Sequence, residues 1–200
     1  MNRYGVTAMA VGTAVNFLLF LTKIYVGISS NSLAIYCDAI NNLGDTAACI
    51  IALTGFLLVR KYDEIKSSRA QSLFTFVISM IISVTGFYFI YSGAERLLYP
   101  LPVSYSVKYA VLIIVTIAVK VLLGIFYWFL GRKCQSPMLK AMVLDSVLDC
   151  FITLATLIGL FLVPKTDYAL DGIFAVVTGI AITVSAIKNL IAQSKYLINN

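Results

Sequence analysis

The sequence predicts an all-α polytopic membrane protein, and two observations support this prediction: the composition and the pattern of apolar runs. Of the 200 residues, 60% are hydrophobic and only 12% are charged. The mean hydropathy is +0.95, well above that of ordinary soluble domains. A hydrocarbon core of roughly 30 Å needs about 20 helical residues, and runs of this length fill nearly the whole chain. We therefore expect one transmembrane domain over residues 1–200.

Six apolar runs are long enough to form membrane-spanning helices. They cover residues 4–28, 32–59, 70–94, 106–130, 138–163 and 169–190. The first run contains Lys23 and is not followed by a small-residue cleavage pattern, so we expect a retained span and not a removed signal peptide. Short segments with Gly, Pro, Ser and charges separate the runs, at residues 29–31, 60–69, 95–105, 131–136 and 164–168.

The basic residues predict the orientation. With a cytoplasmic N-terminus, ten of the 15 Lys and Arg lie on the inner side, against Arg96, Lys108 and Lys165 on the outer side. The ten are Arg3, Arg60, Lys61, Lys66, Arg69, Arg132, Lys133, Lys140, Lys188 and Lys195. The positive-inside rule then puts both termini in the cytoplasm. Anionic lipid headgroups account for this bias, and without an aromatic-interleaved basic stripe we do not expect nucleic acid as a partner.

Two polar pairs lie inside the apolar runs, namely Asn41 with Asp45 in the second and Asp145 with Asp149 in the fifth. An unpaired carboxylate in the membrane costs several kcal/mol, so its presence suggests function. Four residues are about one helical turn, which puts each pair on one face. Two such helices facing each other would form a four-ligand cage for a small ion. The structural alternative is a network of interhelical hydrogen bonds.

The candidate ligands offer oxygen atoms only, and the chain has no histidine. Oxygen ligands suit Mn²⁺, Mg²⁺ or Ca²⁺ better than Zn²⁺. We expect Mn²⁺ first, although Zn²⁺, Fe²⁺ or Co²⁺ could bind because raw affinity follows the usual divalent order. Three carboxylates exceed the charge of a divalent ion, so the empty site should hold protons that metal binding displaces. This linkage predicts cation/proton antiport, with the cation as cargo and no cofactor.

The apolar runs contain further charged residues and cysteines, which we do not expect to be ligands of the ion. Asp38 lies seven residues before Asp45 on the same face and either supports the ligands, conducts protons or is a structural carboxylate. Lys23, near an outer helix end, is expected to snorkel. Lys120 lies deeper and is expected to have a charge partner in the bundle; like Asp38, it is a candidate to support the ligands or conduct protons. The cysteines lack C-x-x-C spacing, so we interpret them as small apolar packing residues; they are Cys37, Cys49, Cys134 and Cys150.

A faint internal repeat relates the two polar pairs. Residues 32–45 align with residues 136–149 without a gap, matching Asn41 to Asp145 and Asp45 to Asp149. Lys-x-x-x-Gly precedes both segments, at Lys23 and at Lys120. Because the second and fifth helices would run in opposite directions, this pattern indicates an inverted repeat with a site near the membrane midplane. Chance similarity is the alternative.

At these residues the chain resembles the cation diffusion facilitator family. Residues 4–45 resemble the first two helices of the family, residues 69–72 the start of the third, residues 95–97 its end and residues 136–149 the fifth. Asp171 stands where the sixth helix of relatives often begins with Asp. The matching positions in the first two helices are Gly12, Asn16, Lys23, Gly27, Ser30, Ser32, Asp38 and Asp45.

The resemblance implies a metal exporter. Zinc-transporting members usually carry His in place of Asn41 or Asp145, whereas the Asn-Asp-Asp-Asp set is similar to that of manganese-exporting bacterial members. It therefore implies Mn²⁺ efflux through a homodimer by alternating access, in a bacterial plasma membrane. The chain departs from the family in two ways. Residues 60–69 lack a His-rich segment, and relatives continue beyond residue 200 into a cytoplasmic domain, so this is either a short member or a truncated chain.

Two other classes of function compete with transport. Intramembrane aspartyl proteases carry Gly-x-Gly-Asp, but residues 42–44 read Asn-Leu-Gly before Asp45 and residues 146–148 read Ser-Val-Leu before Asp149. We therefore do not expect an enzyme, although two carboxylates sharing a proton could serve proteolysis. An acidic-ring cation channel is the other alternative, and coupling to protons would distinguish a transporter from it.

Overall fold

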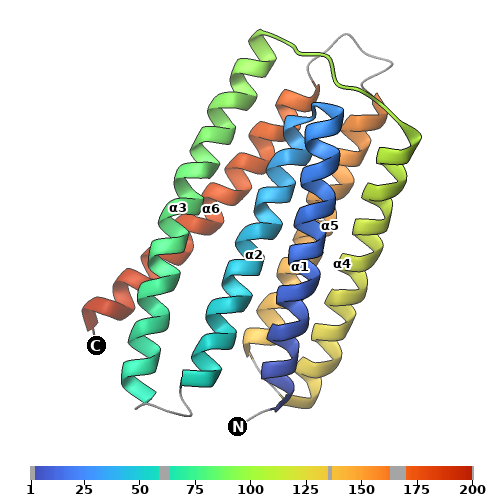
Figure 1. Cartoon of the computed structure of the whole chain (residues 1–200). Coiled ribbons are helices and arrows are strands. Elements are labelled where there is room, and N and C mark those ends of the chain that lie inside the picture. The colour runs from blue at the N-terminus through green and yellow to red at the C-terminus, as the bar shows by residue number, and fades with distance from the viewer. Residues whose placement is uncertain (1–2, 59–63, 135–136, 163–169, 200) are drawn as a thin grey trace.

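The computed structural model describes residues 3–58, 64–134, 137–162 and 170–199 as an all-helical bundle (Figure 1). The six helices are α1 (Arg3–Ser30), α2 (Leu33–Leu58), α3 (Glu64–Leu98), α4 (Val107–Cys134), α5 (Pro137–Leu162) and α6 (Leu170–Asn199). No strand occurs in these ranges. The prediction of an all-α fold with six helices is confirmed.

Several helices are longer than predicted. α3 begins at Glu64 instead of residue 70 and ends at Leu98 instead of residue 94, and α6 continues to Asn199 instead of residue 190. The prediction counted apolar residues, but helical backbone bonds continue past the hydrocarbon core into polar sequence. The predicted connections at residues 60–69 and 131–136 lie partly outside the described residues, and the one at residues 164–168 lies wholly outside them.

Five of the described helical segments are long and apolar enough to cross a membrane. They are Tyr4–Ser30, Gln71–Leu98, Val107–Lys133, Leu139–Leu162 and Leu170–Ile198. α2 is not among them, because Asp38, Asn41, Asn42 and Asp45 lie within eight residues of its sequence. Its 26 residues extend about 39 Å, and it lies alongside α1 through the height of the bundle (Figure 1).

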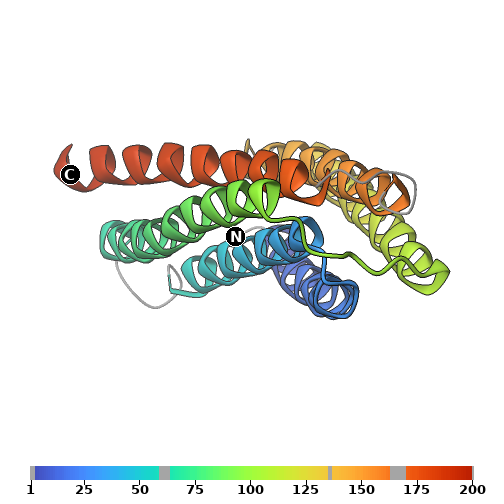
Figure 2. The ribbon, with the colours of Figure 1, turned by 90° about the horizontal axis from the view of Figure 1, so that it is seen from above.

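The helices form two packed groups joined by α2. α1 packs against α2 and α4, and α4 packs against α5, while α3 and α6 form a separate pair. α2 contacts α1, α3, α5 and α6. Both termini lie at one end of the bundle, here called the inner end because the charge distribution assigns it to the cytoplasm (Figure 1). α6 leans away from α5 toward this end, as Figures 1 and 2 show.

Close backbone contact holds the α3–α6 pair together. A Cβ atom on Gly93 would lie 2.9 Å from the backbone nitrogen of Val176 and 3.0 Å from the carbonyl oxygen of Gly172. A Cβ atom on Gly179 would lie 3.0 Å from the backbone nitrogen of Ile90. Small residues that let helix backbones approach are the usual means of packing helices in lipid. The two helices are therefore closely packed along their length.

The start of α2 is fixed to this pair at the outer end. The Asp171 carboxylate of α6 accepts hydrogen bonds from the backbone nitrogen of Leu33 at 2.8 Å and from the Ser32 hydroxyl at 2.5 Å. Arg96 of α3 donates to the same carboxylate at 2.8 Å. Asp171 thus caps the N-terminus of α2 from another helix, which satisfies amide donors that the helix itself leaves unpaired.

Candidate metal centre

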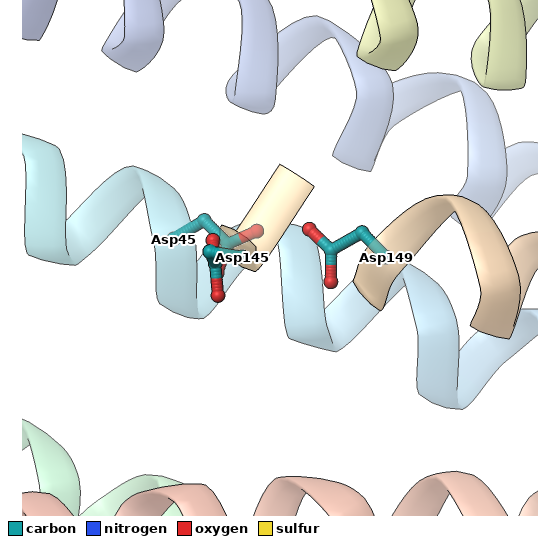
Figure 3. Close-up of side chains that lie close together, drawn as sticks. All are labelled: Asp45, Asp145 and Asp149. Carbon is teal, nitrogen blue, oxygen red and sulfur yellow. The ribbon is translucent and has the colours of Figure 1, made fainter. Parts of the chain in front are cut away.

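The four predicted ligands meet in the interior of the bundle. α2 presents Asn41 and Asp45, and α5 presents Asp145 and Asp149. Figure 3 shows the three carboxylates directed toward one another from these two helices. One oxygen atom from each carboxylate lies within 4.8 Å of the others. The helices are antiparallel, so the one-turn spacing on each brings the side chains into one cluster.

The cluster lies against a cavity of about 610 Å³. Asp149 is buried, Asp45 is partly buried and Asp145 is exposed to the cavity. The cavity continues between α2, α3 and α6, where Thr75, Asn189 and Gln193 line it. These last residues belong to the inner halves of their helices, so the cavity extends from the carboxylates toward the inner end.

Asn41 lies beside Asp149, as the predicted antiparallel pairing requires. Its amide nitrogen donates a hydrogen bond to Asp149 Oδ1 at 2.6 Å. In this arrangement Asn41 is a hydrogen-bond donor to a carboxylate and not a fourth oxygen ligand. Because the side-chain amide offers an oxygen opposite its nitrogen, a half-turn about its last bond would direct that oxygen to the cluster.

Lys120 has the charge partner that the sequence could not name. Its ammonium forms an ion pair with Asp45 Oδ2 at 2.9 Å and a second ion pair with Asp149. It also donates to the amide oxygen of Asn16 at 2.8 Å and reaches that of Asn42 at 3.5 Å. Sequence reasoning missed a site role for Asn16 and Asn42. The available signal was an uncharged amide in the middle of an apolar helix.

Asp38 and Lys23 form a separate ion pair. Lys23 Nζ lies 2.9 Å from Asp38 and 2.8 Å from the Thr153 hydroxyl, and both charged side chains are buried. The expectation that Lys23 snorkels is therefore wrong. Its ammonium is neutralised by a buried carboxylate within reach and does not extend to the membrane surface. For Asp38, the structure favours the structural alternative over a role beside the ligands or in proton conduction.

The donor set of the cluster is oxygen. Among the described residues, the group of side chains close enough to hold a metal ion comprises the three carboxylates and contains no sulfur. Cys37 and Cys49 are buried and unbridged, in agreement with a packing role. Carboxylate oxygens bind hard or borderline divalent cations. The arrangement is suited to hold such a cation between two helices.

Comparison with known proteins gives the family. Residues 9–198 match the family model described as the cation efflux transmembrane domain. The chain is 26% identical over 186 residues to an uncharacterized transporter of Methanocaldococcus jannaschii, covering 91% of this chain and 66% of that protein. It is 28% identical to the cation-efflux pump FieF of Citrobacter koseri and 29% identical to that of Escherichia fergusonii, over 90% of this chain and 62% of each pump.

The chain thus spans less than two thirds of the length of these curated relatives. The family model nevertheless covers nearly all of the described helices, including both that carry the carboxylates. Members of this family are membrane transporters and not enzymes, which removes the protease alternative. The chain belongs to the cation efflux, or cation diffusion facilitator, family of membrane transporters.

Proposed function

We propose that the protein exports a divalent metal cation, Mn²⁺ in the first place, from the cytoplasm in exchange for protons. The observation that carries this proposal is the cluster of three carboxylates, with one oxygen atom from each within 4.8 Å of the others, beside a cavity that extends toward the inner end. Three carboxylates clustered in the membrane are expensive unless cations offset their charge, and the single positive charge of Lys120 offsets only part of it. A cation from the cytoplasm would reach it through the cavity.

The choice of Mn²⁺ rests on the ligand chemistry. Three carboxylates and a neighbouring amide favour a hard or borderline ion over Zn²⁺, which prefers imidazole or thiolate. Zn²⁺, Fe²⁺ and Co²⁺ remain the alternative cargoes within the same transporter class. The similarity to proteins named cation-efflux pumps is compatible with each of these ions.

Proton exchange follows from the charge of the cluster. Three ionised carboxylates in a low-dielectric interior repel one another, so protons and metal ions compete for the same oxygen atoms. A site that faces each side of the membrane in turn then exchanges one for the other. The α3–α6 pair and the remaining helices provide two packed bodies whose relative movement would expose the site alternately.

Transport by purified protein in sealed liposomes tests the proposal. We expect Mn²⁺ uptake that grows with an imposed pH gradient and that falls to background in Asp45→Asn and in Asp149→Asn. Glu95→Gln is the control, because this exposed carboxylate lies at the outer end of α3, and it should transport like the parent. Uptake indifferent to the pH gradient would instead indicate a channel, and uptake retained in both Asp variants would place the site elsewhere.

We also propose a homodimer, as the family resemblance implies. The described helices expose large apolar side chains such as Leu122, Tyr88 and Phe151, and either lipid or a second copy must cover them. Native mass spectrometry of the detergent-solubilised protein should give twice the chain mass. A uniformly monomeric species that retains transport would contradict the dimer and leave the transport proposal intact.

A further inference from the structure

Lys120 occupies the position where a transported cation would bind. The side chain is 2% exposed and reaches the cluster from α4. Its ammonium meets a carboxylate oxygen of α2, a carboxylate oxygen of α5 and an amide oxygen of α1. An ammonium group donates three hydrogen bonds and accepts none. It is therefore a cation held by oxygen atoms from three helices.

We infer that Lys120 is a tethered cation that competes with the metal ion for Asp45 and Asp149, so that metal binding must displace its ammonium toward Asn16 and Asn42. The inference rests on the proposed function, because it assumes that the carboxylates bind the cargo. It adds a residue that lowers the affinity of the site and assists release.

The competition follows from the distances. A divalent ion bound by oxygen ligands lies roughly 2.0–2.6 Å from them, while the Lys120 ammonium lies 2.9 Å from Asp45 Oδ2 and is also ion-paired with Asp149. Two cations that share these oxygen atoms would be only a few Å apart, and in a dry interior their repulsion is strong. Both cannot keep their full set of contacts.

A second position for the ammonium is already present. The Asn16 amide oxygen accepts from Lys120 at 2.8 Å, and the Asn42 amide oxygen lies at 3.5 Å. Both amides are buried. They are uncharged, so an ammonium that binds them leaves the negatively charged carboxylates free for the metal ion. Four rotatable bonds let a lysine ammonium shift without moving the helix backbone. The displaced ammonium therefore keeps buried acceptors while the carboxylates bind the ion.

The charge count supports retention of the ammonium beside the metal. Three carboxylates contribute −3, Lys120 +1 and a divalent ion +2, which sums to zero. Removing Lys120 would leave the loaded site with one uncompensated negative charge. That charge would hold the ion more tightly and slow its release.

Lys23 offers a matched comparison in the same bundle. It is a lysine of similar burial, 1% exposed, and it is paired with Asp38 and Thr153. Neither of these partners is one of the three clustered carboxylates. Loss of Lys23 should therefore cost stability without making metal binding tighter.

Calorimetric titration of purified protein with MnCl₂, combined with liposome transport, tests the inference. Lys120→Met should bind Mn²⁺ roughly tenfold more tightly than the parent and should transport it more slowly. Of the two controls, Lys120→Arg should bind Mn²⁺ with nearly the affinity of the parent, and Lys23→Met should not bind it more tightly. A merely structural lysine would give the opposite sign, namely weaker binding in Lys120→Met. Equal or weaker binding in a folded Lys120→Met protein would overturn the inference.

Asn16→Leu provides a second variant in which Lys120 is intact. It removes the nearer of the two alternative acceptors, so Mn²⁺ binding should weaken several-fold when Lys120 is present. It should not change binding in the Lys120→Met background, and a double-mutant cycle measures this coupling. Unchanged binding in Asn16→Leu alone would overturn the inference even if Lys120→Met does not fold. A parent protein that binds no metal would overturn the proposed function together with the inference, whereas metal binding with no lysine effect overturns the inference alone.

Discussion

The three clustered carboxylates have different surroundings, although their sequence context is similar. Asp149 is buried and contacts Asn41 and Lys120, Asp45 is partly buried and contacts Lys120, and Asp145 is exposed to the cavity. An arriving cation would meet Asp145 first and Asp149 last. The residue that discriminates between ions is then expected among the neighbours of the innermost carboxylate.

Asn41→His tests this discrimination. The substitution adds an imidazole nitrogen next to Asp149, and Zn²⁺ prefers nitrogen ligands of this kind over an amide. We expect Zn²⁺ uptake to rise relative to Mn²⁺ uptake by roughly tenfold, measured by competition among Mn²⁺, Zn²⁺, Fe²⁺, Co²⁺ and Cd²⁺ in liposomes. Asn189→His is the control, because Asn189 lines the same cavity on α6 outside the carboxylate cluster. An unchanged preference in Asn41→His would exclude Asn41 as the discriminating residue.

At the scale of elements, the outer end of α2 is attached to α3 and α6 by a buried ion pair and a helix cap. Asp171 accepts from Ser32 and from the backbone of Leu33, and Arg96 completes the ion pair. These contacts join α2 to α3 and α6 on the outer side. Nearer the inner side the cavity lies between these helices, and the Gln71 amide of α3 donates a hydrogen bond to the Ile51 carbonyl of α2 at 3.3 Å. The polar contacts of Asp171 thus lie at the outer end of α2, whereas the cavity beside the carboxylates lies nearer the inner end.

Asp171→Ala should weaken this outer attachment. It leaves Arg96 as an unpaired buried cation and removes the cap of α2, and breaking a buried ion pair costs about 3–5 kcal/mol. We expect a lower thermal unfolding temperature in detergent and an unchanged Mn²⁺ affinity, since the carboxylate cluster is remote from the cap in sequence and contacts. Glu95→Gln, an exposed carboxylate one residue before Arg96, is the control and should unfold like the parent. Equal stability of Asp171→Ala and the control would show that the contacts of Asp171 do not stabilise the fold.

At the scale of the whole molecule, the position of the cavity indicates the side from which the carboxylates are accessible. Ser185 and Gln193 of α6 line it, and the end toward which it extends carries both termini. With the termini in the cytoplasm, the site is accessible from inside. Under the proposed function, this conformation would accept a cation from the cytoplasm.

Thiol labelling tests this direction. In a variant whose four native cysteines are replaced by alanine, Ser185→Cys should react with a membrane-impermeant maleimide in inverted vesicles and not in intact cells. Leu98→Cys, strongly exposed at the outer end of α3, is the control and should react in intact cells only. Reaction of both cysteines from the same side would contradict the assigned orientation or the inward opening.

Much of the fold could be predicted because hydropathy and length alone determine which segments can cross lipid. The starts and ends of α3 and α6 could not, since helices continue beyond the apolar residues that were counted. The polar pairs of the site could be identified because residues one helical turn apart are four positions apart in the sequence. The partners of Lys120 and Lys23 could not, because they lie on other helices and no local spacing encodes them.

The sequence by itself determined that the chain is a helical membrane protein and that Asn41, Asp45, Asp145 and Asp149 form two one-turn pairs, because both properties depend on neighbours along the chain. Only the tertiary structure decided that a lysine ammonium lies among the carboxylates and that Asp171 caps a distant helix. It also decided on which side the cavity opens. These features depend on how the helices pack, and packing brings together side chains whose separation in sequence carries no periodic signal.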